Sequence, residues 1–274
     1  INQISNILDK SDLIYLHTPI ASHLVRFVNI FYFKKIKIIY HIHGLRYLPG
    51  IWTVKSVFFR LIEFTLSFKT DKFIAINSQD YKSLTKFIPM KKIHLIKGVG
   101  VNLPTKGKVK SLPNPDQIFV VGIIAAFKKE KGYRELVKVA KYCQINPNII
   151  FRVFGYGKYD WVLKLIEEEG VNNIQLKGYV KNIENEIDKF NLFMLPSYRE
   201  GLNVSIQECL SKGVPTLTTN VRGCRDLIVN GYNGYLYEKY DVISASNKIL
   251  KIAHMNKNSY SKLSSNSLEY SKEF

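Results

Sequence analysis

The sequence has few cysteines, no long apolar run and no acidic pair of the D-x-D type. Its three cysteines, Cys143, Cys209 and Cys224, have no spacing typical of a metal or redox site. This argues against a disulfide scaffold and fits a reducing compartment, so we expect all three to be structural. No run of about 18 apolar residues is present and no signal peptide is visible, which excludes the usual membrane-spanning and exported patterns. These absences predict a cytosolic protein.

Acidic residues are scarce in the first part of the chain. The 274 residues carry a net charge of +18, and residues 1–112 hold 18 basic and 5 acidic side chains, a net of +13. This excess of positive charge suits an anionic partner. Three such partners are a membrane surface with acidic lipid, a lipid diphosphate and nucleic acid. A lysine-rich composition of the genome explains it equally well. No nucleic-acid-binding motif is present, so nucleic acid is not expected as a partner.

The hydrophobic pattern predicts two α/β domains. Residues 107–116 are rich in Gly, Pro and Lys and have no apolar period, which indicates a linker. We therefore predict a first domain at residues 1–106 and a second at residues 117–274. Strands alternate with helices on both sides of the linker, which is typical of parallel sheets. The expected strands include residues 12–17, 37–43, 72–77, 93–96, 117–124, 149–154, 174–177, 192–195 and 216–219.

The most informative stretch is residues 192–226. A short apolar strand runs into a loop and then into a helix, which Asn203 or Ser205 can cap. In open α/β sheets, the carboxyl end of such a strand borders a crevice where ligands bind. Glu200 lies in that loop, and Glu208 follows about two turns later on the helix. The sequence thus places two carboxylates at one crevice.

The same loop offers backbone N–H groups at Gly201, Leu202 and Asn203, which form a natural seat for an anion at the helix start. A carboxylate beside a phosphate would repel it. Glu200 and Glu208 make sense if they accept hydrogen bonds from hydroxyl groups on the two sides of a diphosphate, and a sugar nucleotide has that layout. The alternative is that both acids are solvated charges at a helix start, where acids are common.

The run from Glu200 to Glu208, with seven residues between the acids, resembles the E-x7-E signature of bacterial family 4 retaining glycosyltransferases. These enzymes, of the capsule, O-antigen and exopolysaccharide type, have the GT-B fold. Further stretches resemble the family: HTPIASHLVR at 17–26, IIYHIHGLRY at 38–47, KGVGVN at 97–102 and NGYNGYLYE at 230–238. The resemblance covers nearly the whole chain. It implies two Rossmann-like domains facing across a cleft, with the first domain incomplete and the last helix truncated.

The resemblance also implies roles for individual residues. Glu200 would hold hydroxyls of the donor sugar and Glu208 the ribose of the nucleotide, while Lys131 would bind the diphosphate. The nucleobase would lie against the backbone at Tyr179 and Val180. His43 would line the sugar side of the cleft near the reacting carbon, and a packed, hydrogen-bonded histidine is the alternative for it.

The chain departs from the family where an arginine usually contacts the diphosphate, because Ala126 stands there. Lys128 could supply the charge without the bidentate fork, and a solvated turn is its alternative. His41 and His43 project from one face of a strand end and could suggest a metal. No third ligand is spaced to help them, and no D-x-D pair is present, so we expect no metal cofactor.

The residues and the resemblance together predict a retaining glycosyltransferase. It would move a hexose or N-acetylhexosamine from a nucleotide-diphosphate sugar, expected to be a UDP-sugar, to a lipid-linked saccharide in surface polysaccharide biosynthesis. Aromatic residues beside cations, such as Trp52 and Phe58, could meet the inner face of the cell membrane peripherally, although core packing is expected for most of them. Two alternatives stay open: a non-catalytic basic domain that binds anionic membrane or nucleic acid, and a GT-B nucleotide-sugar hydrolase or epimerase.

Overall fold

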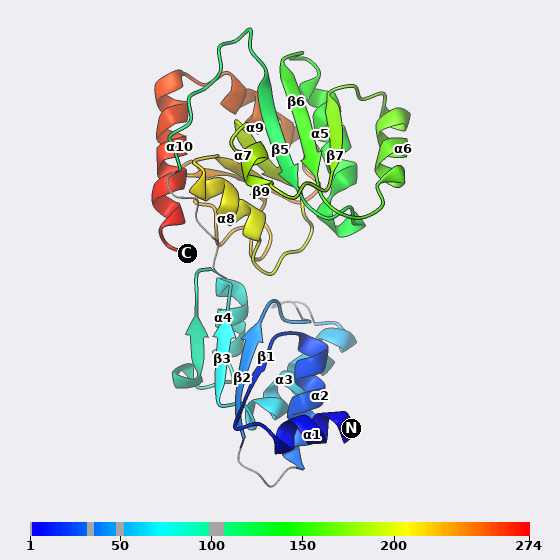
Figure 1. Ribbon diagram of the computed structural model, residues 1–274, viewed down its shortest axis with the longest axis vertical. Coiled ribbons are helices and arrows are strands. Elements are labelled where there is room, and N and C mark those ends of the chain that lie inside the picture. Colours follow the sequence, from blue (N-terminus) through cyan, green and yellow to red (C-terminus); the bar gives the residue numbers. More distant parts are fainter. Residues whose placement is uncertain (1, 32–35, 48–51, 99–106) are drawn as a thin grey trace. The chain divides into compact units, whose positions relative to one another are not determined.

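A computed structural model describes residues 2–31, 36–47, 52–98 and 107–274 of the chain (Figure 1). It forms two compact units, Ile1–Val99 and Gly100–Phe274. Each unit is built on one parallel sheet with helices packed against it, which confirms the predicted α/β class. The predicted end of the first domain at residue 106 and most of the KGVGVN stretch lie outside the described residues.

The described part of the first unit holds a four-stranded sheet in the order β1-β2-β3-β4. Helices connect successive strands, which is the connection that parallel neighbours require. The elements are α1 (Asn2–Asp9), β1 (Leu13–Leu16), α2 (Pro19–Ile30), β2 (Lys37–Ile42), α3 (Val54–Ser67), β3 (Lys72–Ala75), α4 (Ser78–Leu84), the 3-10 turn η1 (Met90–Lys92) and β4 (Ile93–Leu95).

A buried charged group joins α2 to α3. Arg26 is fully buried, and its Nη2 donates to Glu63 Oε2 at 2.9 Å, while His23 Nε2 lies 2.7 Å from the other carboxylate oxygen. Burial by itself would raise the pKa of Glu63, but the hydrogen bond from His23 and the charge of Arg26 lower it overall. The guanidinium also lies over the ring of Tyr40 in β2, 4.4 Å from its centroid. Both helices are thereby held against the sheet.

The second unit holds a six-stranded parallel sheet in the order β10-β9-β8-β5-β6-β7. Its elements are β5 (Phe119–Ile124), the 3-10 turn η2 (Lys129–Lys131), α5 (Tyr133–Cys143), β6 (Ile149–Phe154), α6 (Asp160–Glu169), β7 (Ile174–Gly178), α7 (Glu184–Ile187), β8 (Leu192–Leu195), α8 (Val204–Ser211), β9 (Thr216–Thr219), β10 (Gly234–Tyr237), α9 (Val242–Ala253) and α10 (Lys257–Ser271).

Helices cover both faces of this sheet, and the side chains of β8 pack against the helices on both sides. All four of its side chains are completely buried. Leu192 and Met194 belong to the cluster that packs under α5 and α9, whereas Phe193 and Leu195 belong to the cluster under α8. A strand buried on both faces reads as a continuous apolar run, because successive side chains point to opposite sides. This is why the short run LFML is so easily recognised as a strand.

Residues 107–116, predicted as a linker, have no helix or strand, and they pack on the second unit. Leu112 is buried in the cluster that contains α5 and α9. The backbone N–H of Lys110 donates to Ser264 Oγ in α10 at 2.7 Å, and Lys110 Nζ donates to the carbonyl of Asp188 at 2.6 Å. This stretch therefore belongs structurally to the second unit.

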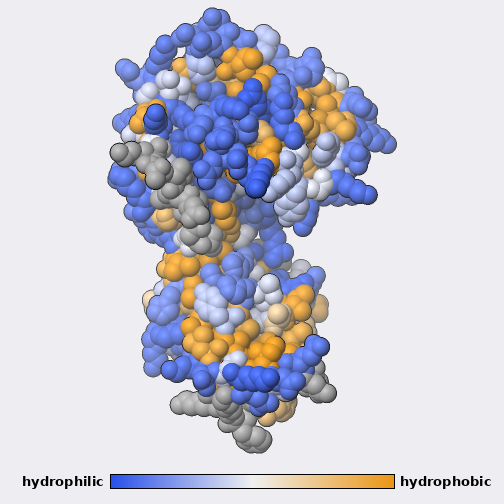
Figure 2. Space-filling view, in the orientation of Figure 1, coloured by the Kyte–Doolittle hydropathy of each residue, from blue (hydrophilic) through white to orange (hydrophobic). Residues whose placement is uncertain are grey.

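Helices α2 and α3 expose apolar side chains at helical spacing. The exposed positions are Ile20, Leu24 and Phe27 of α2, Phe31 at its end, and Val54, Phe58, Leu61 and Phe64 of α3, with Trp52 just before α3. Figure 2 shows apolar side chains on the visible surface of this unit. Trp52 and Phe58, which the sequence offered as aromatic residues that could meet a membrane, are 75% and 56% exposed and do not pack in the core.

The three cysteines are free and buried. Burial raises the pKa of the Cys143 and Cys224 thiols to about 12, and it also raises the pKa of Cys209. They are protonated at neutral pH and pack as small apolar side chains. Among the described residues, none of the helices has the length and apolar character of a membrane span.

Candidate functional site

The strand order of the second unit creates a switch point between β5 and β8. From β5 the chain continues outward to β6 and β7 on one side, while β8, β9 and β10 extend on the other side. Helices α5 and α8, which follow β5 and β8, therefore pack on opposite faces of the sheet, and the two connecting loops meet at the carboxyl ends of these neighbouring strands. In open parallel sheets, this arrangement opens a crevice at the carboxyl ends of the strands.

Two predicted site residues meet at this crevice. Lys131 follows β5, in the turn before α5, and Glu200 lies in the loop after β8. Lys131 Nζ is 2.7 Å from Glu200 Oε1, and the side chains are only 20% and 9% exposed. The chain thus holds a positive and a negative group side by side where a ligand can bind.

The backbone explains why these loops come so close. Gly132 has φ +74°, and a Cβ atom there would lie 1.9 Å from the carbonyl oxygen of Pro196, so only glycine fits. The same two loops are also joined by a hydrogen bond, in which the backbone N–H of Tyr198 donates to the carbonyl of Glu130 at 2.9 Å. The two loops are therefore joined through their main chains, and Lys131 and Glu200 are brought together as a consequence.

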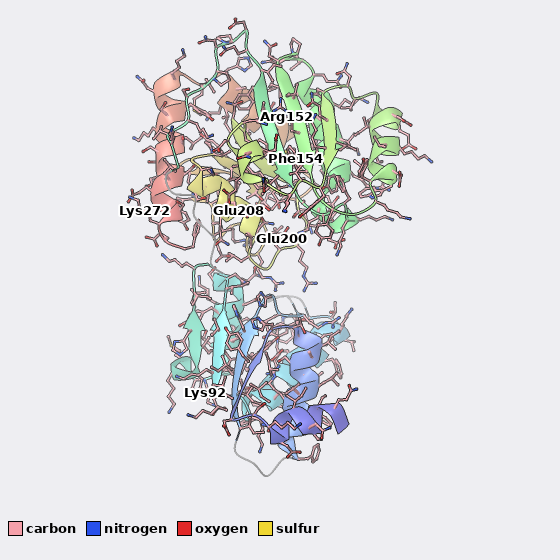
Figure 3. The ribbon with its side chains drawn as sticks, in the orientation of Figure 1. Lys92, Arg152, Phe154, Glu200, Glu208 and Lys272 are labelled. Atoms are coloured by element: carbon pink, nitrogen blue, oxygen red, sulfur yellow. The ribbon has the colours of Figure 1, made fainter. Side chains whose placement is uncertain are left out.

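Helix α8 carries the second glutamate. Asn203 caps the helix, because its side chain accepts from the N–H of Ile206 at 3.0 Å, as one of the two predicted caps. Glu208 is half-buried on α8, and burial followed by the nearby charge of Glu184 raises its pKa. Glu200 and Glu208 both lie at the α8 side of the second unit (Figure 3). Among the described residues no cation forms a salt bridge with Glu208, so burial has removed water from its carboxylate without supplying a cationic partner.

The loop after β9 supports the loop that bears Glu200. A Cβ atom on Gly223, whose φ is +81°, would lie 2.3 Å from the carbonyl oxygen of Gly201. Arg222 is 4% exposed, and its Nε–H donates to the carbonyl of Glu200 at 3.4 Å. The sequence assigned no role to Arg222. Its place in the loop that follows the buried strand β9 (Thr216–Thr219) was the available signal.

A pocket of about 300 Å³ lies at the carboxyl ends of β5, β6 and β7 and reaches the first turn of α8. Its lining includes Ala126, Tyr179, Val180 and Ser205. Tyr179 and Val180, predicted to border a nucleobase, thus share a pocket with the position where the family carries an arginine. Alanine leaves that position small and uncharged, and Lys128 is exposed in the adjoining turn. The predicted roles of all these residues stay predictions.

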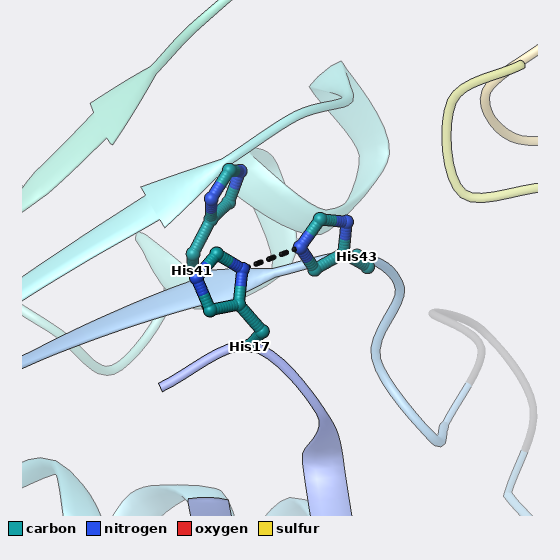
Figure 4. A group of neighbouring side chains, drawn as sticks. All are labelled: His17, His41 and His43. Carbon is teal, nitrogen blue, oxygen red and sulfur yellow. Dashed lines mark hydrogen bonds between the residues drawn. The ribbon is translucent and has the colours of Figure 1, made fainter. Parts of the chain in front are cut away.

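Three histidines lie close together in the first unit, whereas the residues described so far belong to the second unit. His17 follows β1, His41 lies in β2 and His43 follows β2 (Figure 4). One ring nitrogen of each lies within 4.8 Å of the others, and His17 Nδ1 is 3.1 Å from His43 Nε2. The expectation that no third ligand accompanies His41 and His43 is therefore wrong. Strands β1 and β2 are parallel with Leu16 opposite Tyr40, so His17 follows beside His41.

Burial, and after it the charges of His43 and His17, lower the pKa of His41 to about 4. The pKa of His43 is lowered for the same reasons. Both rings are therefore neutral at pH 7, and a neutral imidazole has one nitrogen with a free lone pair. Such a ring can accept a hydrogen bond or bind a metal, but it does not contribute a fixed positive charge.

Comparison with known proteins adds a family to this geometry. A sequence profile described as Glycosyl transferases group 1 matches residues 106–270. EpsD of Bacillus subtilis (strain 168) is 24% identical over 270 residues, which cover 92% of this chain and 70% of EpsD. An Escherichia coli protein named UDP-Gal:alpha-D-GlcNAc-diphosphoundecaprenol alpha-1,3-galactosyltransferase is 25% identical over 231 residues. That alignment covers 78% of this chain and only 59% of the relative's length.

A solved structure shares the fold. HepE of Anabaena, in complex with UDP and glucose, superposes with a TM-score of 0.79 at 18% sequence identity. The superposition covers 100% of this chain and 77% of HepE. At this level of identity the likeness concerns the fold, and it confirms the predicted GT-B class of two Rossmann-like units.

Proposed function

The chain belongs to the family of glycosyl transferases group 1, and on that premise we propose that it transfers a sugar from a nucleotide-diphosphate sugar to a saccharide acceptor. The observation that carries the proposal is the contact of Lys131 with Glu200 at the switch point of the second unit. A cation suits a diphosphate and a carboxylate suits sugar hydroxyls, so the pair marks the boundary between these two parts of one donor.

The remaining donor contacts follow from this boundary. The amides at Gly201, Leu202 and Asn203 stand at the start of α8, where the helix dipole favours the diphosphate. Glu208, farther along α8, binds the ribose hydroxyls, which replace the water that burial has removed from its carboxylate. Lys128 adds charge from the exposed turn. The base occupies the pocket that Tyr179 and Val180 line.

The donor is a UDP-sugar carrying a hexose or N-acetylhexosamine. The names of two similar proteins support this choice: one contains UDP-Gal, and the other is a complex with UDP and glucose. Transfer proceeds with retention at the anomeric carbon, an assignment that rests on the likeness to family 4 enzymes. No side chain is assigned as a nucleophile. His43 orients the sugar, and the leaving diphosphate accepts the proton of the attacking hydroxyl.

The acceptor is a lipid-linked saccharide, used in surface polysaccharide biosynthesis at the inner face of the cell membrane. Support comes from the name of the Escherichia coli relative, which contains a diphosphoundecaprenol-linked sugar. It also comes from the first part of the chain, where the net charge of +13 accompanies the exposed apolar side chains of α2 and α3. Basic charge beside apolar side chains is the composition of a peripheral membrane surface.

The test is a transfer assay with a panel of nucleotide sugars and undecaprenyl-diphosphate-linked acceptors in anionic vesicles. We expect a lengthened glycolipid with one donor, and Glu200→Ala abolishes the product. Glu168→Ala is the matched control, because that carboxylate on α6 is 55% exposed and, among the described residues, pairs only with Lys164 on the same helix. Full turnover by a correctly folded Glu200→Ala protein would remove Glu200 from the site.

The products also separate the other functions. Release of free sugar or of an isomerised nucleotide sugar would identify a hydrolase or an epimerase. Binding to vesicles or nucleic acid that decreases steeply with salt, without selection among nucleotides, would identify a non-catalytic basic domain.

A further inference from the structure

Among the three histidines at the carboxyl ends of β1 and β2, His41 has a polar atom without a partner among the described residues. His17 and His43 satisfy one another through the 3.1 Å contact between Nδ1 and Nε2. His41 uses Nδ1 for a 3.0 Å hydrogen bond with the hydroxyl of Tyr15. Its Nε2 is buried and has no hydrogen-bond partner in the part of the chain that the structure describes. Buried polar atoms are rarely left in this state, because burial removes their water without replacing it.

We propose that His17, His41 and His43 bind one transition-metal dication of the Zn²⁺, Co²⁺ or Ni²⁺ class through three ring nitrogens. A tetrahedral site with metal–nitrogen bonds of about 2.0–2.1 Å places its nitrogens about 3.3 Å apart. The observed 3.1 Å between His17 and His43 is close to that separation. The third nitrogen lies within 4.8 Å of the other two, a distance that a rotation of the His41 or His43 ring can shorten.

The surroundings fit this class of ion. Imidazole nitrogens favour zinc, copper, nickel and iron, whereas Mg²⁺ and Ca²⁺ favour oxygen. The Tyr15 hydroxyl can accept the Nδ1–H of His41 and thereby leave the Nε2 lone pair for the ion, which is the usual outer-shell arrangement.

Two further features define the site. His17 and His43 are exposed, so the fourth position opens to solvent and can take water or an oxygen of a ligand. The net charge of +13 over residues 1–112 opposes any cation, so affinity depends on the nitrogen–metal bonds. A metal on Nε2 of His43 leaves its Nδ1 for the sugar contact proposed above. The proposed metal site can be tested separately from the proposed sugar transfer. Apart from His43, the residues proposed to bind the sugar nucleotide all belong to the second unit.

The experiment uses the untagged chain after removal of metal with EDTA and dialysis. Titration with Zn²⁺ by calorimetry, and with Co²⁺ by visible absorption, measures affinity and stoichiometry without any activity. We expect one equivalent to bind, with an absorption typical of four-coordinate Co²⁺. His17→Gln and His43→Gln each weaken binding at least about tenfold, and Tyr15→Phe weakens it by roughly tenfold because the outer-shell partner is lost.

His94→Gln is the matched control, because His94 in β4 is an exposed histidine of the same unit outside the cluster. It leaves the affinity unchanged. The variants of His17, His43 and His94 change exposed side chains, so their effect on metal binding is not an effect on folding. His41 is buried, so His41→Gln is included only if its circular dichroism spectrum matches that of the unchanged protein. The proposal is overturned if no ion binds, if the His17 and His43 variants bind as the unchanged protein does, or if His94→Gln weakens binding equally.

Discussion

Replacing Lys131 or Glu200 distinguishes donor binding from a purely structural contact. The two groups are 2.7 Å apart and are 20% and 9% exposed. Breaking a fully buried ion pair costs about 3–5 kcal/mol, because the remaining charge has neither water nor a partner. An exposed pair contributes only about 0–1 kcal/mol. The intermediate exposure places the loss for Lys131→Met at about 2 kcal/mol in the free energy of unfolding of the second unit.

The effect on binding differs between the two partners. Glu200→Gln keeps the shape of the side chain but removes its charge, and a hydrogen bond to a charged group contributes about 1.5–3 kcal/mol. If Glu200 accepts from sugar hydroxyls, affinity for the UDP-sugar decreases by roughly tenfold or more. Affinity for UDP alone is unchanged or increases, because Lys131 is released for the diphosphate. Lys131→Met weakens the binding of UDP and of the UDP-sugar alike.

Calorimetry with UDP and with the UDP-sugar would measure these affinities for the unchanged chain, both single variants and the double variant. Urea unfolding would measure stability in the same set, and Glu168→Gln is the control. Equal weakening of UDP and UDP-sugar by Glu200→Gln would refute the reasoning. In that case Glu200 acts only by holding Lys131 in place.

Three other changes test separate parts of the structure. Burial and Glu184 raise the pKa of Glu208, so the folded chain is destabilised by its charge; Glu208→Gln should raise the melting temperature at pH 7 while lowering UDP affinity. Gly132→Ala should lower the free energy of unfolding by more than about 1 kcal/mol and weaken UDP binding, since its φ is +74° and the new Cβ would clash with Pro196. The pKa of His41 is lowered from 6.5 to about 4 in the folded chain, so as pH falls the unfolded chain takes up a proton at this ring before the folded chain does. The contribution of the neutral His41 to the stability of the first unit is therefore complete above pH 6.5 and is lost as pH falls towards 4. Hydrogen exchange of the β2 amides, measured across this range, would report the loss.

The alternation of strands and helices was predictable from the sequence because each element has its own local signal. The runs at 149–154, 192–195 and 216–219 were predicted with the bounds that the structure has. The structure also contains β10 (Gly234–Tyr237), which was not among the strands expected from the sequence. This strand is short, begins with glycine and lies at the sheet edge, where pairing with β9 defines it. Local propensity alone does not show such a strand.

The candidate site was predictable in its parts and not in its contacts. The E-x7-E spacing placed Glu200 in a loop and Glu208 on a helix, and the structure has them there. Nothing in the spacing of Lys131 and Glu200, 69 residues apart, shows that they touch. That contact depends on β5 and β8 being neighbours in the sheet, and on the close approach that Gly132 permits.

The sequence alone determined the two α/β units, the loop that bears the acids and the basic character of the first 112 residues, because strand burial, helix capping and charge are local properties. Tertiary structure decided which loops meet. Parallel pairing of β1 with β2 brought His17 beside His41 and His43, and so supplied the third ring that spacing along the chain could not show. Strand order is the physical reason in both places, since it joins the ends of strands that are far apart in sequence.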